Sequence, residues 1–184
     1  MNFNNNGYLE IFIGPMFSGK TTKLYDLYNL SIQKGESIIA VNYIEDTRYH
    51  NSLLSTHDEK MIPCVQCKKL SEIIGFKQIT DSETILINEA QFFEDLFEHV
   101  IYLVEELHKK VFLCGLDGDF KRSKFGQVLD LIPFCDKVTK LNAKCGCKNN
   151  AIFSHRLSQE EQQVVIGSSN YVPLCRNCYL LKNP

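Results

Sequence analysis

The sequence predicts an α/β fold with a mostly parallel sheet. Short apolar runs alternate with stretches of helical periodicity between residues 8 and 114, which is typical of parallel strands covered by helices. A glycine-bounded turn at 14–21 separates the first apolar run from the first helical stretch. Beyond about residue 143 closely spaced cysteines replace the helical pattern. We therefore expect an α/β domain over 1–142 and a small second domain over 143–184.

The elements are expected in the following order. Residues 1–7 read as a disordered tail and 44–60 as polar loop, and 143–184 shows strand-like runs at 151–157 and 163–166 without a helical pattern. Gly35 is expected to end the first helix, because glycine is common just past a helix terminus. The remaining expected elements are a strand at 8–13, a helix at 20–34, a strand at 37–43, a short helix at 70–76, a strand at 84–87, a long amphipathic helix at 93–107 and a strand at 111–114.

Composition excludes several classes of protein. The 184 residues include 20 Lys plus Arg and 22 Asp plus Glu, a net charge of −2, so no basic excess is available to neutralise nucleic-acid phosphates. No apolar run reaches the roughly 18 residues of a membrane span, and the polar start lacks the features of a secretory signal. We expect a cytoplasmic protein, and in a reducing compartment its eight cysteines favour metal binding over disulfides.

The turn after the first strand fits the phosphate-binding pattern G-x-x-x-x-G-K-[ST]. In such a loop, backbone N–H groups and the helix N-terminus face phosphate oxygens. Lys20 would reach the outer phosphates, and the Thr21 hydroxyl would contact Mg²⁺. The pattern indicates ATP or GTP and leaves the acceptor open. Its residues are Gly14, Pro15, Met16, Phe17, Ser18, Gly19, Lys20 and Thr21.

An acidic residue directly follows the apolar strand at 84–87. Glu89 comes after Asn88, where P-loop proteins often carry an acid that holds Mg²⁺. Glu89 could also act as general base toward an attacking hydroxyl. The alternative is an acid that only complements a helix dipole, but the nearby phosphate loop favours a functional role.

The ordered set of motifs resembles the type II thymidine kinase family, the cellular and poxvirus type. The similarity runs from about residue 8 to 182. It rests on the phosphate loop and on the segments Asp46-Thr-Arg-Tyr49, Thr56-His-Asp58, Asn88-Glu-Ala-Gln-Phe-Phe93, Leu116-Asp-Gly-Asp-Phe120, Phe125-Gly126, Tyr171 and Cys175-Arg-Asn-Cys178.

The resemblance implies a RecA-like P-loop core and a zinc-binding lasso domain that closes over the nucleoside. It implies phosphorylation of thymidine, and of deoxyuridine, at the 5′-hydroxyl by ATP with Mg²⁺. A homotetramer and feedback inhibition by thymidine triphosphate are also implied.

The family's functional residues can be assigned to matching positions. Glu89 matches the catalytic base, Asp46 and Arg48 match a pair near the phosphates, and Gln91 lies in the matching nucleotide-binding stretch. The guanidinium of Arg48 suits phosphate oxygens. The nucleoside would be surrounded by the residues matching Met16, Phe92, Leu116, Phe120, Phe125, Ser154, Val165, Ile166, Gly167 and Tyr171.

The C-terminal cysteines predict a structural zinc site. Cys175 and Cys178 form a C-x-x-C half-site, and Cys145 and Cys147 supply the other half. Four thiolates make a closed tetrahedral site with no position for catalysis. We interpret a second C-x-x-C, Cys64–Cys67, as incidental.

Two positions depart from the family pattern. The family usually has Asp-Glu where this chain has Asn88-Glu89, so an oxygen acceptor is kept but its charge is lost. The family usually has C-x-x-C where this chain has Cys145-Gly146-Cys147. Either Gly146 permits a tighter turn, or one of these cysteines is not a ligand.

Two other functions compete with a thymidine kinase. A P-loop kinase with a different nucleoside or nucleotide acceptor is disfavoured by the matching aromatic residues. A nucleotide-binding module without catalysis is supported by Asn88 alone, whereas Lys20 and Glu89 favour transfer.

Overall fold

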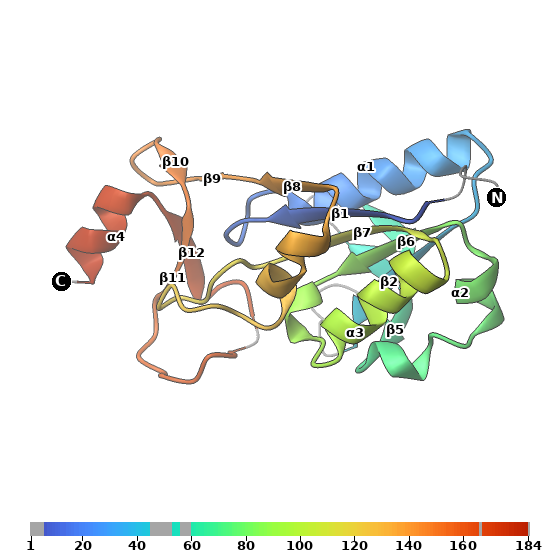
Figure 1. Cartoon of the computed structure of the whole chain (residues 1–184). Coiled ribbons are helices and arrows are strands. Elements are labelled where there is room, and N and C mark those ends of the chain that lie inside the picture. Colours follow the sequence, from blue (N-terminus) through green and yellow to red (C-terminus); the bar gives the residue numbers. More distant parts are fainter. Residues whose placement is uncertain (1–5, 45–52, 56–59, 166, 184) are drawn as a thin grey trace.

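The fold is built around a six-stranded sheet, shown in Figure 1. The structure is a computed structural model, and it describes residues 6–44, 53–55, 60–165 and 167–183. Every strand pairing in this sheet is parallel, so the predicted α/β class is confirmed. In order across the sheet the strands are β5 (Val65–Cys67), β2 (Ile38–Tyr43), β6 (Thr84–Asn88), β7 (Lys110–Gly115), β1 (Tyr8–Ile13) and β8 (Lys137–Lys140).

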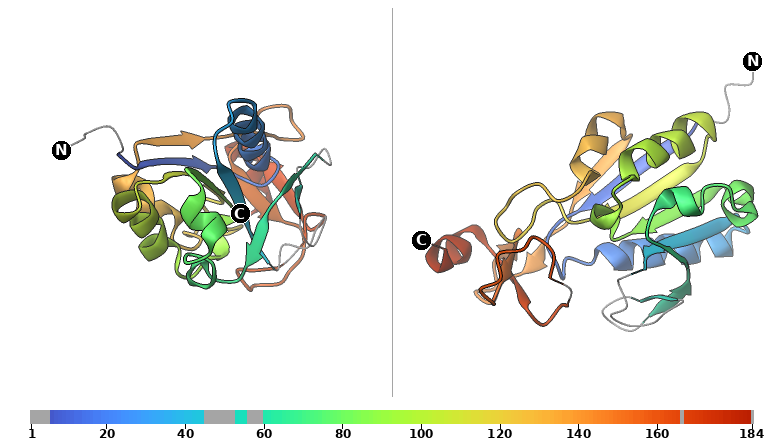
Figure 2. Two further views of the ribbon diagram at one scale, coloured as in Figure 1. Left: turned by 90° about the vertical axis from the view of Figure 1, so that its right-hand side faces the viewer. Right: turned by 90° about the horizontal axis from the view of Figure 1, so that it is seen from below.

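Helices cover both faces of the sheet. In Figures 1 and 2, α1 (Lys20–Gln33) lies on one face, while α3 (Leu96–Ile101) lies on the other. The 3₁₀ segment η4 (Val128–Phe134) packs beside α3 on that second face. Because the strands are parallel, their carboxyl ends all lie at one edge of the sheet, where loops can form a site.

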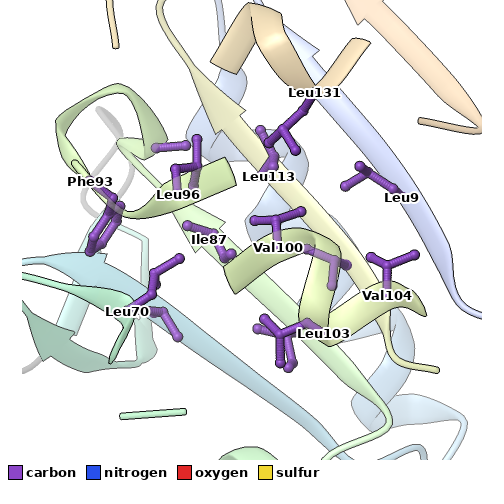
Figure 3. Close-up of a cluster of buried hydrophobic side chains, with 14 of the residues drawn as sticks. Leu9, Leu70, Ile87, Phe93, Leu96, Val100, Leu103, Val104, Leu113 and Leu131 are labelled. Carbon is purple, nitrogen blue, oxygen red and sulfur yellow. The ribbon is translucent and has the colours of Figure 1, made fainter. Parts of the chain in front are cut away.

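Alternate side chains of the four inner strands, β2, β6, β7 and β1, enter two different cores. Leu9 of β1 packs with Ile87 and Val100 on the α3 side (Figure 3), and Ile11 belongs to the same cluster. Phe12, one residue further on, packs on the α1 side with a second cluster that includes Leu24 and Leu86. Because both faces are buried, the strands read as continuous apolar runs, which is why the sequence pattern located them.

Two predicted helices have different bounds. The long helix begins at Leu96 instead of residue 93, and it continues as a π-helical segment, η3 (Tyr102–Glu106). Phe93 enters the core from extended backbone after the 3₁₀ turn η2 (Ala90–Phe92). The helix was predicted to begin at Phe93 because this buried residue happens to fit the helical spacing of the apolar residues that follow it. The helix expected at 70–76 is a 3₁₀ turn, η1 (Leu70–Glu72), followed by α2 (Lys77–Asp81).

Several short elements were not predicted. Part of the expected loop at 44–60 is strand β3 (Leu53–Ser55), which pairs with β4 (Met61–Pro63). Edge strands β5 and β8 were also missed, because each is short and gains its conformation from the neighbouring strand. The expected tail is described only at Asn6 and Gly7, and the backbone of Gly7 lies against the Val104 carbonyl.

The C-terminal part lies at one end of the sheet (Figure 1). The absence of a helix there was predicted wrongly, because α4 (Arg176–Lys182) follows the last strand. The strand expected at 163–166 is also wrong at 163–165, the part that the structure describes. The strands of this part are β9 (Ala143–Lys144), β10 (Asn150–Ala151), β11 (Phe153–Arg156) and β12 (Tyr171–Leu174). Within the described parts of the chain, no helix has the length and apolar character needed to cross a membrane.

The Asp95 carboxylate links α3 to the η1 turn. Its Oδ1 accepts a hydrogen bond from the Leu70 N–H at 3.0 Å, and its Oδ2 accepts one from the Ser71 N–H at 2.9 Å. Burial acts to raise the pKa of Asp95, but these N–H groups, the Ser71 hydroxyl and His99 outweigh it and lower the pKa below its usual value.

We expect Asp95→Ala to reduce the free energy of unfolding by about 1–2 kcal/mol at pH 7, because two backbone donors lose their acceptor. A carboxyl whose folded-state pKa is lowered stabilises above its unfolded pKa of about 3.9, and the stabilisation is lost as pH falls through the folded value. The difference between parent and variant should therefore narrow below about pH 4. Urea unfolding from pH 7 to 3 measures this, with Glu98→Ala as the exposed control on the same helix. If the parent and Asp95→Ala differ in free energy of unfolding by the same amount at every pH, the ionised Asp95 carboxylate is not the stabilising group.

Candidate active site

The phosphate loop connects β1 to α1. Gly14 has φ 146° and Gly19 φ 82°, both on the side of backbone space that glycine tolerates. A Cβ on Gly14 would lie 2.4 Å from the Leu141 carbonyl oxygen, so the loop also needs glycine there for close approach. The Lys20 ammonium is folded over the loop, and its Nζ donates to the Pro15 carbonyl at 2.7 Å. The predicted strand–turn–helix around the motif is confirmed.

Asn88 forms a polar network where β6 ends beside the phosphate loop. Its Oδ1 accepts hydrogen bonds from the Thr21 hydroxyl at 3.3 Å and from the Cys114 thiol at 3.0 Å. Its Nδ2 donates to Asn42 Oδ1 on the neighbouring strand β2 at 2.8 Å. Thr21 and Asn88 are thus in direct contact in the fold. The partner Asn42, 2% exposed, was not predicted, because only the β2–β6 register brings it there.

Glu89 follows Asn88 in a left-handed conformation, φ 52° and ψ 41°. Gln91 Nε2 donates to Glu89 Oε2 at 2.6 Å, while Gln91 Oε1 accepts the Leu116 N–H at 3.0 Å. Gly126 closes over the same residue, since a Cβ there would lie 2.2 Å from the Gln91 carbonyl oxygen. Gln91 is therefore fixed on two sides and orients the Glu89 carboxylate.

A single cavity of about 480 Å³ brings these groups together. Phe17, Ser18, Gly19, Lys20 and Thr21 of the phosphate loop line it, with Asn88, Glu89 and Gln91. Every described residue predicted to surround a nucleoside also lines it, namely Met16, Phe92, Leu116, Phe120, Phe125, Ser154, Val165, Gly167 and Tyr171. Gly14 and Pro15 shape the loop from outside the cavity wall. Asp46, Arg48, Ile166 and the Thr56-His57-Asp58 segment lie outside the described residues.

Aromatic rings form one wall of the cavity. Phe92 stacks on Tyr43, with ring centroids 5.1 Å apart and planes inclined by 27°. Phe125 meets Phe92 edge-on, with centroids 5.4 Å apart. Such a wall offers flat apolar surface to a planar ring. Tyr43 was not predicted as a site residue, although it ends a predicted strand at the edge where parallel strands form sites.

Residues of the C-terminal part also line the cavity. Ser154 of β11 is 4% exposed, and its hydroxyl accepts a hydrogen bond from the Met16 N–H at 3.0 Å. Asp119 Oδ2 accepts a hydrogen bond from Gln163 Nε2 at 2.8 Å. Asp119 and Gln163 line the cavity too, and they were missed because 44 residues separate them in the sequence. The cavity beside the phosphate loop is therefore bordered by residues of both parts of the chain.

The four C-terminal cysteines come together in one cluster. The sulfurs of Cys145, Cys147, Cys175 and Cys178 all lie within 4.8 Å of one another, and those of Cys147 and Cys175 are 3.5 Å apart. Ligands about 2.3 Å from a tetrahedral zinc ion are ~3.8 Å apart, so the cluster fits zinc. Backbone N–H groups of Cys147 and Cys175 lower the pKa of the Cys145 thiol to about 6, which favours the thiolate that zinc requires.

The second C-x-x-C behaves as part of the core. Cys67 is 2% exposed and packs in the α3-side cluster. Burial raises the pKa of its thiol to about 12, so the reactive thiolate is disfavoured. The incidental interpretation of Cys64–Cys67 agrees with this environment.

The fold and the site define an α/β protein of the P-loop class, with an aromatic-lined cavity next to the phosphate-loop motif. A family model described as thymidine kinase matches residues 7–179. The chain is 38% identical over 180 residues to a thymidine kinase of Oryza sativa subsp. japonica, which covers 95% of this chain and 66% of the relative. It is 35% identical to the sheeppox virus and 36% identical to the vaccinia virus thymidine kinase, covering 96% of this chain and 98% of each relative. The chain therefore belongs to the thymidine kinase family and is an enzyme of that type.

Proposed function

We propose that this chain transfers the γ-phosphoryl group of ATP to the 5′-hydroxyl of thymidine, and also of deoxyuridine, in salvage of pyrimidine deoxynucleosides. The observation that carries the proposal is the shared cavity. Lys20, Glu89 and the aromatic wall all border the same space of about 480 Å³, which supports the binding of a triphosphate beside a planar ring.

Lys20 and the loop backbone would hold the triphosphate. The loop's N–H groups and the N-terminus of α1 favour anionic oxygens, and the Lys20 ammonium adds a positive charge that is 9% exposed. Coulomb attraction to developing charge is larger in such a partly desolvated position than in bulk water. Asp46 and Arg48 are proposed to approach the same phosphates.

Glu89 would accept the proton of the 5′-hydroxyl. A carboxylate needs a defined orientation to take up this proton as the phosphoryl group transfers. The Gln91 hydrogen bond to Glu89 Oε2, at 2.6 Å, supplies that orientation. The second Gln91 contact, to the Leu116 N–H, holds the amide in the donating direction.

Mg²⁺ would be held by the ATP phosphates and the Thr21 hydroxyl, and when bound it neutralises charge on the transferring group. The donor set fits such an ion, because Thr21 and Asn88 supply neighbouring oxygens joined at 3.3 Å. Asn88 lacks the charge of the family's usual aspartate. We therefore expect Asn88 to hold the water molecules around Mg²⁺ more weakly than an aspartate would.

We expect Asn88→Asp to lower the Mg²⁺ concentration for half-maximal rate by roughly three- to tenfold and to raise kcat, because a carboxylate attracts the hydrated cation more strongly than an amide. Asn42 can accommodate the change by turning its amide, so that its NH₂ donates to the new carboxylate. Initial rates over a free Mg²⁺ series at saturating ATP and thymidine measure the effect. Unchanged Mg²⁺ dependence and kcat would contradict this account of Asn88.

The pocket walls support a pyrimidine nucleoside as acceptor. Phe92, Phe125 and Tyr171 offer flat apolar surfaces, and backbone groups of Val165, Ile166 and Gly167 are proposed to bind the edge of the base. Met16 and Leu116 would border the sugar and the base. The Ser154 hydroxyl accepts a hydrogen bond from the Met16 N–H, which supports a defined distance between the proposed phosphate and base regions.

A coupled ADP-release assay with ATP and Mg²⁺ tests the proposed function. Thymidine, deoxyuridine, deoxycytidine and deoxyguanosine are compared at equal concentrations. We expect kcat/KM for thymidine and deoxyuridine to exceed that for the other two by at least about 100-fold, since a wrong base edge leaves buried polar groups unpaired. ATP binding without turnover on any nucleoside would contradict the proposal. A preference for deoxycytidine or deoxyguanosine would show that the acceptor is not thymidine.

Further properties are proposed on the family resemblance. They are a zinc-binding lasso domain over 143–184 next to a RecA-like P-loop domain over 1–142, a homotetramer, feedback inhibition by thymidine triphosphate, and a cytoplasmic location. Contact with the P-loop supports the lasso assignment, since Ser154 bonds the Met16 N–H. We expect no binding of nucleic acid or membrane, consistent with the net charge of −2.

A further inference from the structure

Arg156 is a buried cation whose hydrogen-bonding capacity is filled. It ends β11 and is 4% exposed. Its Nε and Nη2 donate to the Tyr171 hydroxyl at 3.0 and 2.6 Å. The remaining donors reach backbone carbonyls of Glu160 (2.8 Å), Gln162 and Gln163 (2.9 Å). An arginine has five N–H donors, and all five are used on neutral oxygens.

These bonds shape the segment 157–165, which connects β11 toward β12. The segment contains no helix or strand, so it lacks the ladder of backbone bonds that would otherwise fix its path. Arg156 gathers three of its carbonyls around one planar group. The Tyr171 hydroxyl, held by Arg156, donates in turn to the Val165 carbonyl at 3.1 Å.

The same guanidinium also contacts the loop that follows β7. Its central carbon lies 3.8 Å from the centroid of the Phe120 ring, a stacking distance for arginine on an aromatic face. Gln163 adds a second connection, because its Nε2 donates to Asp119 Oδ2 at 2.8 Å and to the Lys124 carbonyl at 3.2 Å. The segment is thus attached to the loop that follows β7.

Resting on the proposed function, we infer that Arg156 is a positioning residue that sets the affinity for the nucleoside. Arg156 does not line the cavity, but it contacts Phe120, Tyr171 and Gln163, which do. It therefore acts on the pocket through the residues that border it. It is remote from the phosphate loop in its contacts, so phosphoryl transfer itself should depend on it little.

The experiment compares Arg156→Gln and Arg156→Lys with the parent chain, using KM for thymidine, KM for ATP and kcat. We expect KM for thymidine to rise about tenfold or more in both variants, with KM for ATP and kcat within about twofold. Lysine should not restore the parent value, because a point charge cannot bond four separate acceptors in one plane. Arg176→Gln, an exposed arginine of α4, is the matched control with unchanged constants.

A second readout does not depend on turnover. Glu160 and Glu161 lie in the exposed part of the segment, so a glutamate-specific protease reports its order. We expect thymidine to protect the parent chain from cleavage there, and Arg156→Gln to be cut several-fold faster and protected only at higher thymidine concentration. Arg156→Gln that is folded and keeps the parent's KM and cleavage rate would overturn the inference.

Gln163→Ala tests the inference if the arginine variants do not fold. Gln163 is exposed and its substitution leaves the Arg156 bond to its carbonyl in place, so the fold should persist. We expect KM for thymidine to rise roughly three- to tenfold, with KM for ATP unchanged. Equal rises in both KM values would contradict a nucleoside-specific role. A parent chain that turns over no thymidine would instead reject the proposed function, and protease protection would then be measured with whichever nucleoside is turned over.

Discussion

Replacing Glu89 by glutamine is expected to lower kcat by about 10²–10⁴-fold while ATP binding stays within about twofold. Glutamine keeps the size of the side chain and removes its ability to take a proton. Its amide can still meet Gln91, whose Nε2 now bonds the carboxylate at 2.6 Å, so the cavity wall should persist. The loss should therefore fall on the transition state, with KM for thymidine little changed.

The measurement is the steady-state rate of ADP release, together with ATP affinity from calorimetry. Glu98→Gln serves as the control, because it makes the same chemical change at an exposed position of α3 and should keep full activity. A Glu89→Gln enzyme with more than about a tenth of the parent kcat would reject the general-base assignment. Loss of ATP binding together with kcat would indicate a structural role for Glu89 instead.

The second large effect is expected at the cysteine cluster. Cys145→Ser and Cys147→Ser should each lose most of the one zinc ion that we expect the parent chain to bind, since the cluster brings all four sulfurs within 4.8 Å of one another. A structural zinc site is worth of the order of 10 kcal/mol in small domains. Its loss should disorder β9–β12, raise KM for thymidine strongly and make the C-terminal part sensitive to protease.

Zinc content by atomic emission spectroscopy measures this, with Cys135→Ser as the control. Cys135 lies outside the cluster, and its thiol donates to the Ile132 carbonyl, a bond that a serine hydroxyl can also make. Full zinc in either cluster variant would mean that the short Cys145-Gly146-Cys147 segment leaves one cysteine outside the coordination shell.

Local patterns predicted the central part of the fold because the evidence for it is local. The strand at 8–13, the phosphate loop and the helix from Lys20 are adjacent in the sequence, and Gly35 ends that helix with φ 71°. Short elements such as β5 and β8 depend on neighbours far along the chain. The helix α4 was missed because its seven residues are too few to show helical periodicity. It packs on the cysteine region through one buried residue, Tyr179, so no apolar stripe marks it in the sequence.

The site was predictable where motifs or family resemblance marked it. Lys20, Glu89 and the aromatic residues line one cavity, as expected. Asn42 and Arg156 carried no such mark, and Asp119 lay in a matching segment without an assigned role, since each acquires its role through a partner that only folding brings near. The sequence offered one signal for Arg156, its place inside the strand-like run at 151–157. Arginine is rarely buried without several acceptors, so an arginine in such a run can indicate a hydrogen-bonding role.

The position of β1 within the sheet has a consequence for biosynthesis. β1 pairs with β7 and β8, whose residues follow it by about 100 and 127 positions. At about 5–20 residues per second on the ribosome, its first partner is completed roughly 5–20 s after β1 itself. During that interval the apolar strand β1 has neither of its native partners, so newly made chains should rely on chaperones to avoid aggregation until β7 has been synthesised.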